Sequence, residues 1–252
     1  LGGTAGATTA VVTGGPSVYS VAVSGMTGDG TVLASIGSSK AQDAAGNTNT
    51  ASTSGDNTVS YDATAPTVTV EQAAGQADPS GSTPIEFTVE FSEPVSGFAT
   101  GDVTLGGTAG ATTGTVSEIA PNDGTTYTVA VSGMTGDGAV IASIGASKAQ
   151  DAAGNTNTAS TSGDNTVSYD TTAPTVTVEQ AAGQADPAGA APIEFTVTFD
   201  EPVASFTGAN LTLGGSAPGT LSASVSGGPS DAAARQSMDD LKGFVRRHLL
   251  GG

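Results

Sequence analysis

The sequence predicts an all-β protein assembled from tandem domains, each a sandwich of two β-sheets. Three observations predict this architecture: frequent Val and Thr with few helix formers before residue 230, short segments in which apolar and polar side chains alternate, and an internal repeat of domain length. Alternation with a period of two gives each strand one apolar face, which two packed antiparallel sheets can bury together. Tryptophan is absent and aromatics make up 4% of residues, so each core is expected to be thin.

The internal repeat has a period of 108 residues along most of the chain. Residues 24–79 and 132–187 are identical except at four positions, and residues 1–9 recur as 105–113. The offset of this second match is 104 residues, and the change of length falls in the loop that contains GGPS at 14–17 in one copy and the longer EIAPNDG at 118–124 in the other. Such a period is too long for one coil of a solenoid and suits a whole sandwich domain. The four differences are Thr31/Ala139, Leu33/Ile141, Ser38/Ala146 and Ala63/Thr171.

The period divides the chain into four parts. We expect a complete repeat at residues 63–170, the C-terminal part of a preceding repeat at 1–62, the N-terminal part of a following repeat at 171–229, and a divergent tail at 230–252. The chain opens at Leu1 without Met or a signal peptide, and we expect it to be a fragment of a longer protein. Short Pro-containing linkers join the repeats, which favours a stiff array.

The complete repeat carries about seven strand signals separated by Gly, Pro, Asn and Asp turns. The clearest is the alternation of Ile85, Phe87, Val89 and Phe91 with polar residues. A further edge strand is expected near Val116. The other expected strands lie near residues 67–70, 103–105, 126–131, 140–144 and 167–169.

The charge balance excludes several classes of partner. With 24 acidic and 6 basic residues the net charge is −18, so the chain offers little to neutralise nucleic-acid phosphates or anionic membranes, while divalent cations are favoured. The absence of cysteine excludes disulfides and thiol chemistry, and no apolar run reaches the length of a membrane span.

Four segments resemble the bacterial Ig-like repeats of large secreted adhesins and biofilm-associated surface proteins. They are TAPTVTVE at 64–71, IEFTVEFSEPVSGF at 85–98, TYTVAVSG at 126–133 and QDAAGNTNTAS at 150–160. The resemblance implies tandem immunoglobulin-like β-sandwich repeats, an extracellular or cell-surface stalk or adhesive role, no catalysis, and calcium at domain junctions. Its partners would be neighbouring repeats of the same array.

Calcium is the one site hypothesis that the residues support. Hard cations bind several oxygens from Asp, Asn and backbone carbonyls, and such residues lie in Gly-containing loops and in the linkers. Glu93 and Glu201 could also approach the linkers. The alternative is that these Asp and Asn residues only form local turns. The candidate ligands are Asp43, Asn47, Asp62, Asp151, Asn155 and Asp170.

The sequence predicts no catalytic residue. The only histidine, His248, lies outside the repeats, so no serine in the array has a histidine as its base. Glu90 and Glu93 are interpreted as solvent-facing carboxylates rather than an acid–base pair.

The leading functional interpretation is a non-catalytic stalk that spaces an adhesive tip from a cell. One alternative is a module that itself binds a glycan or a host protein, for which the loop at residues 118–124 is the candidate surface. Another is a disordered low-complexity linker, which the regular strand pattern opposes.

The two ends of the chain leave two further questions open. Residues 1–62 carry late strands and 171–229 early ones, so together they could complete one sandwich, between chains or within one, or both could stay poorly folded.

In the tail, Ser237 and Asp240 resemble a capping box ahead of helically spaced apolar residues. A short amphipathic helix is one interpretation, and an out-of-register sequence without a selected role is the other, which the abrupt change of composition favours.

Overall fold

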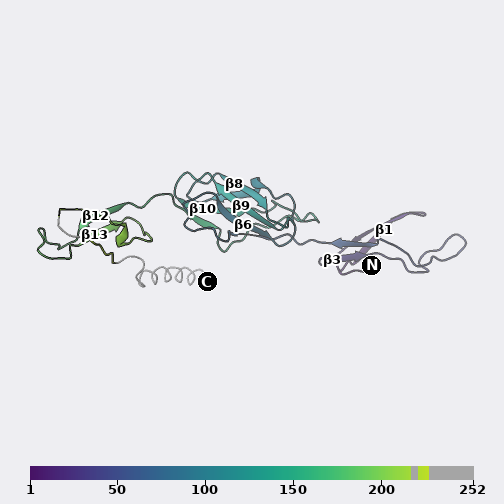
Figure 1. Ribbon diagram of the computed structural model, residues 1–252. Coiled ribbons are helices and arrows are strands. Elements are labelled where there is room, and N and C mark those ends of the chain that lie inside the picture. Colours follow the sequence, from purple (N-terminus) through teal and green to yellow (C-terminus); the bar gives the residue numbers. More distant parts are fainter. Residues whose placement is uncertain (217–220, 227–252) are drawn as a thin grey trace. The chain divides into compact units, whose positions relative to one another are not determined.

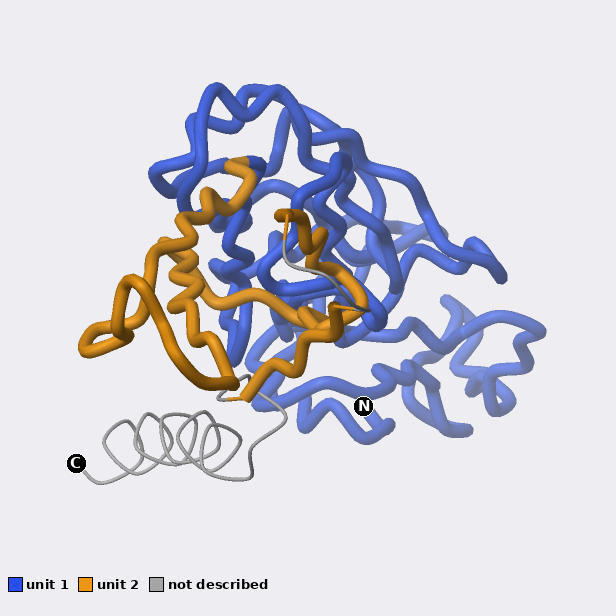
Figure 2. Tube along the Cα trace, turned by 60° about the vertical axis from the view of Figure 1, so that its left-hand side comes forward, with its two compact units in different colours: residues 1–171 blue, residues 172–252 orange. Residues whose placement is uncertain are grey.

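The computed structural model describes residues 1–216 and 221–226. The chain divides into two compact units, residues 1–171 and 172–252 (Figure 2). The described residues form strands and two short 3₁₀ turns, which confirms the all-β class. The helix expected within residues 230–252 lies outside the described residues.

A complete sandwich forms the C-terminal part of the first unit (Figure 1). One sheet has the order β5-β6-β9-β8 and the other β11-β10-β7, with every neighbouring pair antiparallel. A 3₁₀ turn, η1 (Thr100–Asp102), leads into β7. These seven strands agree with the strand signals of the sequence. Their bounds are β5 Val68–Gln72, β6 Ile85–Phe91, β7 Val103–Gly106, β8 Thr113–Glu118, β9 Thr126–Ser132, β10 Gly138–Ile144 and β11 Thr166–Tyr169.

The core of this sandwich consists of the apolar positions of the alternating strands. In β6, Ile85, Phe87 and Val89 have no exposed surface, whereas the intervening Glu86 and Glu90 are exposed. Burying such side chains contributes about 1.5–3 kcal/mol each, so this small set supplies most of the stabilisation of the repeat. Val129 and Val131 come from the neighbouring strand β9, and the facing sheet supplies Val140, Ala142, Ile144 and Val167.

Three aromatic rings close one end of the core. Phe91, Phe98 and Tyr127 contact one another edge to face, with centroid separations of 5.1–5.9 Å. Such pairs add about 0.5–1.5 kcal/mol beyond the area that they bury. In the second unit the counterparts of the two phenylalanines, Phe199 and Phe206, form a similar pair at 5.2 Å.

Residues 1–61 form two separate two-stranded sheets, β1-β2 and β3-β4, in which most side chains are exposed. Their counterparts are the late strands of the sandwich, β8–β11. Val21 and Val59, whose counterparts Val129 and Val167 are fully buried, face solvent here, whereas β3 is half-buried. The bounds are β1 Thr9–Gly14, β2 Tyr19–Ser24, β3 Gly30–Leu33 and β4 Thr58–Tyr61.

The described part of the second unit contains one two-stranded sheet, β12 (Val176–Gln180) with β13 (Phe195–Phe199), and a 3₁₀ turn, η2 (Gly208–Asn210). Residues 211–214 correspond to β7 but form no strand. In the sandwich β7 pairs with β10, and the described residues of this unit contain no counterpart of β10. Strand formation therefore depends on the partner as well as on local sequence.

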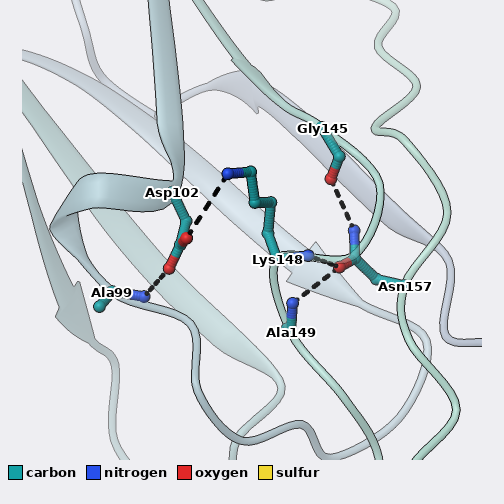
Figure 3. Close-up of polar contacts among 6 residues, drawn as sticks. All are labelled: Ala99, Asp102, Gly145, Lys148, Ala149 and Asn157. Carbon is teal, nitrogen blue, oxygen red and sulfur yellow. Dashed lines mark hydrogen bonds and ion pairs between the residues drawn. The ribbon is translucent and has the colours of Figure 1, made fainter.

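A buried asparagine organises the loop that follows β10 (Figure 3). The side-chain oxygen of Asn157 accepts hydrogen bonds from the N–H groups of Lys148 (2.7 Å) and Ala149 (2.8 Å), and its amide donates to the carbonyls of Gly145 (3.0 Å) and Thr158 (2.6 Å). The side chain is only 2% exposed. Every polar group of the amide is therefore satisfied by the loop that surrounds it.

Replacing Asn157 with Ala should destabilise the sandwich by about 2–4 kcal/mol, because it leaves buried backbone groups without partners. The matched control is Asn49→Ala, which removes the same four bonds in the first repeat, where the side chain is partly exposed. Water can replace those bonds, so the control should cost markedly less. Urea denaturation of both variants measures the difference, and equal losses would contradict the assigned role of Asn157.

Candidate functional site

The linker between the first two repeats is held by side chains from both. Asp29, in the turn between β2 and β3, accepts hydrogen bonds from the N–H of Ala63 (2.7 Å) and from the Thr64 hydroxyl. On the other side, the Asn155 amide donates to the carbonyl of Asp62 at 3.2 Å. The linker is thus tied to a turn of one repeat and a loop of the next.

Three carboxylates meet at this linker. One oxygen from each of Asp62, Glu93 and Asp151 lies within 4.8 Å of the others. They come from the linker, from the turn after β6 and from the loop between β10 and β11. Residues almost 90 positions apart in the sequence are therefore gathered at the place where the sandwich begins.

Asp151 is 6% exposed and is held in place by its own loop. Its Oδ1 accepts the N–H groups of Ala153 (2.8 Å) and Asn155 (2.9 Å), and its Oδ2 accepts the Asn155 amide at 2.8 Å. Burial by itself would raise the pKa of Asp151, but the hydrogen bonds outweigh it and the pKa is lowered. The group is therefore ionised in the folded protein, and it contributes to a local turn as well as to the carboxylate cluster.

The pKa of Glu93 shifts in the opposite direction to that of Asp151. Burial raises the pKa of Glu93, and the negative charges of Asp151, Asp62 and Asp29 raise it further. The only basic residue between positions 63 and 170, Lys148, instead forms an ion pair with Asp102 at 3.9 Å. The cluster therefore concentrates negative charge that no Lys or Arg of its own repeat neutralises.

The donor set fits a hard divalent cation. All three ligand atoms are carboxylate oxygens, which Ca²⁺ and Mg²⁺ prefer, and the ionised Asp151 is fixed before any ion binds. A cation at this point would contact the linker and the sandwich at once.

A sequence model of the bacterial Ig-like domain matches residues 62–168. The middle repeat is a bacterial Ig-like domain. No curated protein and no solved structure matches the chain. Domains of this family are typically non-catalytic structural parts of surface proteins. Within residues 1–216 and 221–226, no helix is both long and apolar enough to cross a membrane.

The Ig-like domain brings together three of the six residues predicted as ligands, namely Asp62, Asp151 and Asn155. Asp43 and Asn47 form the corresponding loop of the first repeat, with Asn47 donating to Asp43 through its N–H and its amide, both at 2.9 Å. Among the described residues Asp43 belongs to no group of three carboxylates.

Asp170 ends the Ig-like domain, where its N–H donates to the carbonyl of Ser80 at 3.0 Å. It is the counterpart of Asp62 at the next linker, and Glu201 is the counterpart of Glu93. Asp137, the counterpart of Asp29, accepts the N–H of Thr171 (2.8 Å) and its hydroxyl (2.9 Å). The two linkers are thus fastened in a similar way to the repeat that precedes them.

Asp29 is the residue of this site that sequence analysis missed. Its Gly-Asp-Gly context is typical of a hairpin turn, and that signal does not distinguish an aspartate that only shapes the turn from one that reaches the linker. Its distance in sequence from Ala63, 34 residues, gives no local clue.

Replacing Glu93 with Gln should stabilise the Ig-like domain at neutral pH when divalent cations are chelated. Because the folded-state pKa of Glu93 is raised, folding favours its protonated form, and its contribution to stability falls as pH rises above the unfolded-state pKa. The melting temperature of Glu93→Gln in chelator should exceed that of the parent by a few degrees at about pH 7, and the two should converge near pH 4. Calorimetry across this range checks the sign, and a constant difference would contradict it.

Proposed function

We propose that this chain is a structural stalk segment of an extracellular bacterial adhesin or biofilm surface protein, in which tandem Ig-like repeats hold a binding tip away from the cell. The observation that carries the proposal is an Ig-like domain joined to near-identical neighbours by a linker that side chains of both repeats hold. A linker fixed in this way transmits orientation from one repeat to the next, which a spacer requires and an isolated binding domain does not.

The composition supports the same function. Stalk repeats need solubility and resistance to collapse more than a reactive site, and a net charge of −18 provides self-repulsion along the array. Near-identity of the copies suits a part whose length matters more than the details of any one repeat.

Calcium at the linker is the second element of the proposal. The carboxylates of Asp62, Glu93 and Asp151 would hold the ion, with Asn155 keeping Asp151 in position. The bound ion would supply positive charge that offsets the repulsion raising the pKa of Glu93. The linker would then be held by ligation in addition to its hydrogen bonds, and the stalk would be stiffest where calcium is abundant.

Calcium should stabilise the Ig-like domain in the full chain and so raise its melting temperature. At a calcium concentration about 100 times the Kd, the free energy of unfolding should increase by about 2.7 kcal/mol. Glu93→Gln should abolish most of this gain. The matched control is Glu201→Gln, the same change one repeat later, which should keep it, since Glu201 belongs to no group of three carboxylates among the described residues. Calorimetry with and without chelator measures all three proteins. A parent melting temperature indifferent to calcium removes the ion from the proposal and leaves the stalk function standing.

A loop exchange tests the stalk function against direct ligand binding. The loop at 118–124 is exposed over most of its length, and the first repeat carries GGPS in its place. Replacing EIAPNDG with GGPS should leave adhesion of cells displaying the full surface protein unchanged, whereas deleting one whole repeat should shorten its reach. Lost adhesion after the loop exchange alone, with the melting temperature preserved, would instead favour a binding module.

A further inference from the structure

The first and last segments of the Ig-like domain, residues 66–80 and 158–170, run side by side in the same direction. We call these two segments the terminal pair. One parallel bridge lies at the edge of the sheet that contains β5, and another at the edge of the sheet that contains β11, so the pair passes from one sheet of the sandwich to the other. The bridges join Thr69 to Thr161 and Ser80 to Tyr169.

Six backbone hydrogen bonds cross between the two segments. Their nitrogen–oxygen distances are 2.6–3.1 Å, and they follow one another from the start of β5 to the end of β11. The terminal pair is therefore a continuous seam along one side of the sandwich. In chain order the bonds join Pro66 to Thr158, Val68 and Val70 to Thr161, Gln72 to Asp164, and Ser80 to Ser168 and Asp170.

Glu71 fastens the terminal pair near its middle. Its Oε1 accepts the N–H of Gly163 at 2.8 Å, and its Oε2 accepts the N–H of Asp164 at 2.7 Å. The Ser162 hydroxyl also donates to Oε2, at 3.5 Å. Hydrogen bonds to a carboxylate are stronger than those between neutral groups, so this one side chain holds the turn at residues 162–164 against β5.

Core side chains keep the two segments in register. Val68 and Val70 of β5 are at most 2% exposed, and Val167 of β11 is fully buried. A slip of one residue along a sheet turns the inward side chains of a strand outward. The terminal pair therefore cannot slide without removing these valines from the core.

Tension along the chain acts on the terminal pair lengthwise. The chain enters the domain beside the first of the six bonds, at Pro66, and leaves it beside the last, at Asp170. Tension draws the first segment toward its N-terminal end and the second toward its C-terminal end. Because the segments are parallel, these pulls slide one against the other and load all the hydrogen bonds at once. The covalent path between the segments stays slack until they slip, since it runs through the other strands of the sandwich.

We propose that the terminal pair is a mechanical clamp that lets the Ig-like domain carry tension along the chain, with Glu71 as the residue that locks it. This load-bearing function deepens the stalk function, and its use to the cell rests on that proposal. A stalk is pulled lengthwise whenever its tip is held. The clamp resists in that direction, whereas the same bonds give way one at a time when the segments are peeled apart.

Optical tweezers test the clamp in the full chain, which has no cysteine of its own. Handles attached at Ala63→Cys and Ala173→Cys, both exposed, load the terminal pair lengthwise. Handles at Ala63→Cys and Ala159→Cys instead pull on neighbouring ends of the two segments and peel them apart. At one loading rate the lengthwise geometry should need a several-fold higher unfolding force. The unfolding event is recognised by the length that it releases, at most about 3.6 Å for each residue between the handles.

Glu71→Gln tests the lock. Glutamine keeps the size of the side chain but has one acceptor oxygen, so it cannot accept both N–H groups in the same way. The lengthwise unfolding force should fall, and the peeling force should change much less. Glu86→Gln, the same change at an exposed position of β6 outside the terminal pair, should leave both forces unchanged.

Val131→Ala separates the clamp from overall stability. Val131 is fully buried in β9 and lies outside the terminal pair, so its truncation should lower the melting temperature at least as much as Glu71→Gln does. Forced unfolding depends on the barrier that must be crossed rather than on equilibrium stability. Val131→Ala should therefore reduce the lengthwise force less than Glu71→Gln.

Equal unfolding forces in the two pulling geometries would overturn the clamp, and that comparison leaves every hydrogen bond of the terminal pair in place. An unchanged lengthwise force in Glu71→Gln would overturn the lock. So would a force that simply follows the melting temperature through Glu71→Gln and Val131→Ala. Cell adhesion after the loop exchange tests the stalk function separately, so failure of either proposal can be told from failure of the other.

Discussion

The position of β9 between β6 and β8 is the constraint on which the rest of the structure depends. Its inward side chains complete the core, and the strand joins the two hairpins of one sheet. Residues 1–61 contain a counterpart of β9 but none of β5 and β6, and the same sequence behaves differently there. Val167 in β11 is fully buried, whereas Val59, in the identical TVSY segment of β4, is 68% exposed. Burial here is a property of the complete set of strands, because each apolar face needs a facing sheet.

This constraint explains what the sequence could predict. Alternation of side chains in segments such as Ile85–Phe91 identifies a strand and its buried face without knowledge of its partners, so the seven strands and the sandwich follow from pattern alone. The failure of residues 211–214 to form a strand does not follow, because their sequence nearly equals that of β7. What differs among the described residues is the presence of a paired strand, which lies outside any local window.

Some residues of the candidate site could likewise be predicted from the sequence, and others could not. Linker and loop aspartates such as Asp62 and Asp151 could be identified because the repeat shows where two domains meet and where turns recur. The roles of Asp29 and Asn157 could not, because each acts on backbone that is remote in sequence or hidden by folding. An Asn in a Gly-containing loop is typical of an exposed turn, and only the packed loop shows that this one is buried and satisfied on all sides.

The near-identity of the repeats makes their strands interchangeable. Any strand of one copy carries the side chains and register to replace its counterpart in another, so a chain of such repeats can exchange strands between neighbours as readily as it folds them in place. Within a full array each repeat supplies its own β9, and the local strand has the higher effective concentration. The high negative charge opposes this exchange by mutual repulsion, and a cation that neutralises the linkers weakens the opposition. The same ion that stiffens a stalk would therefore also favour association between stalks.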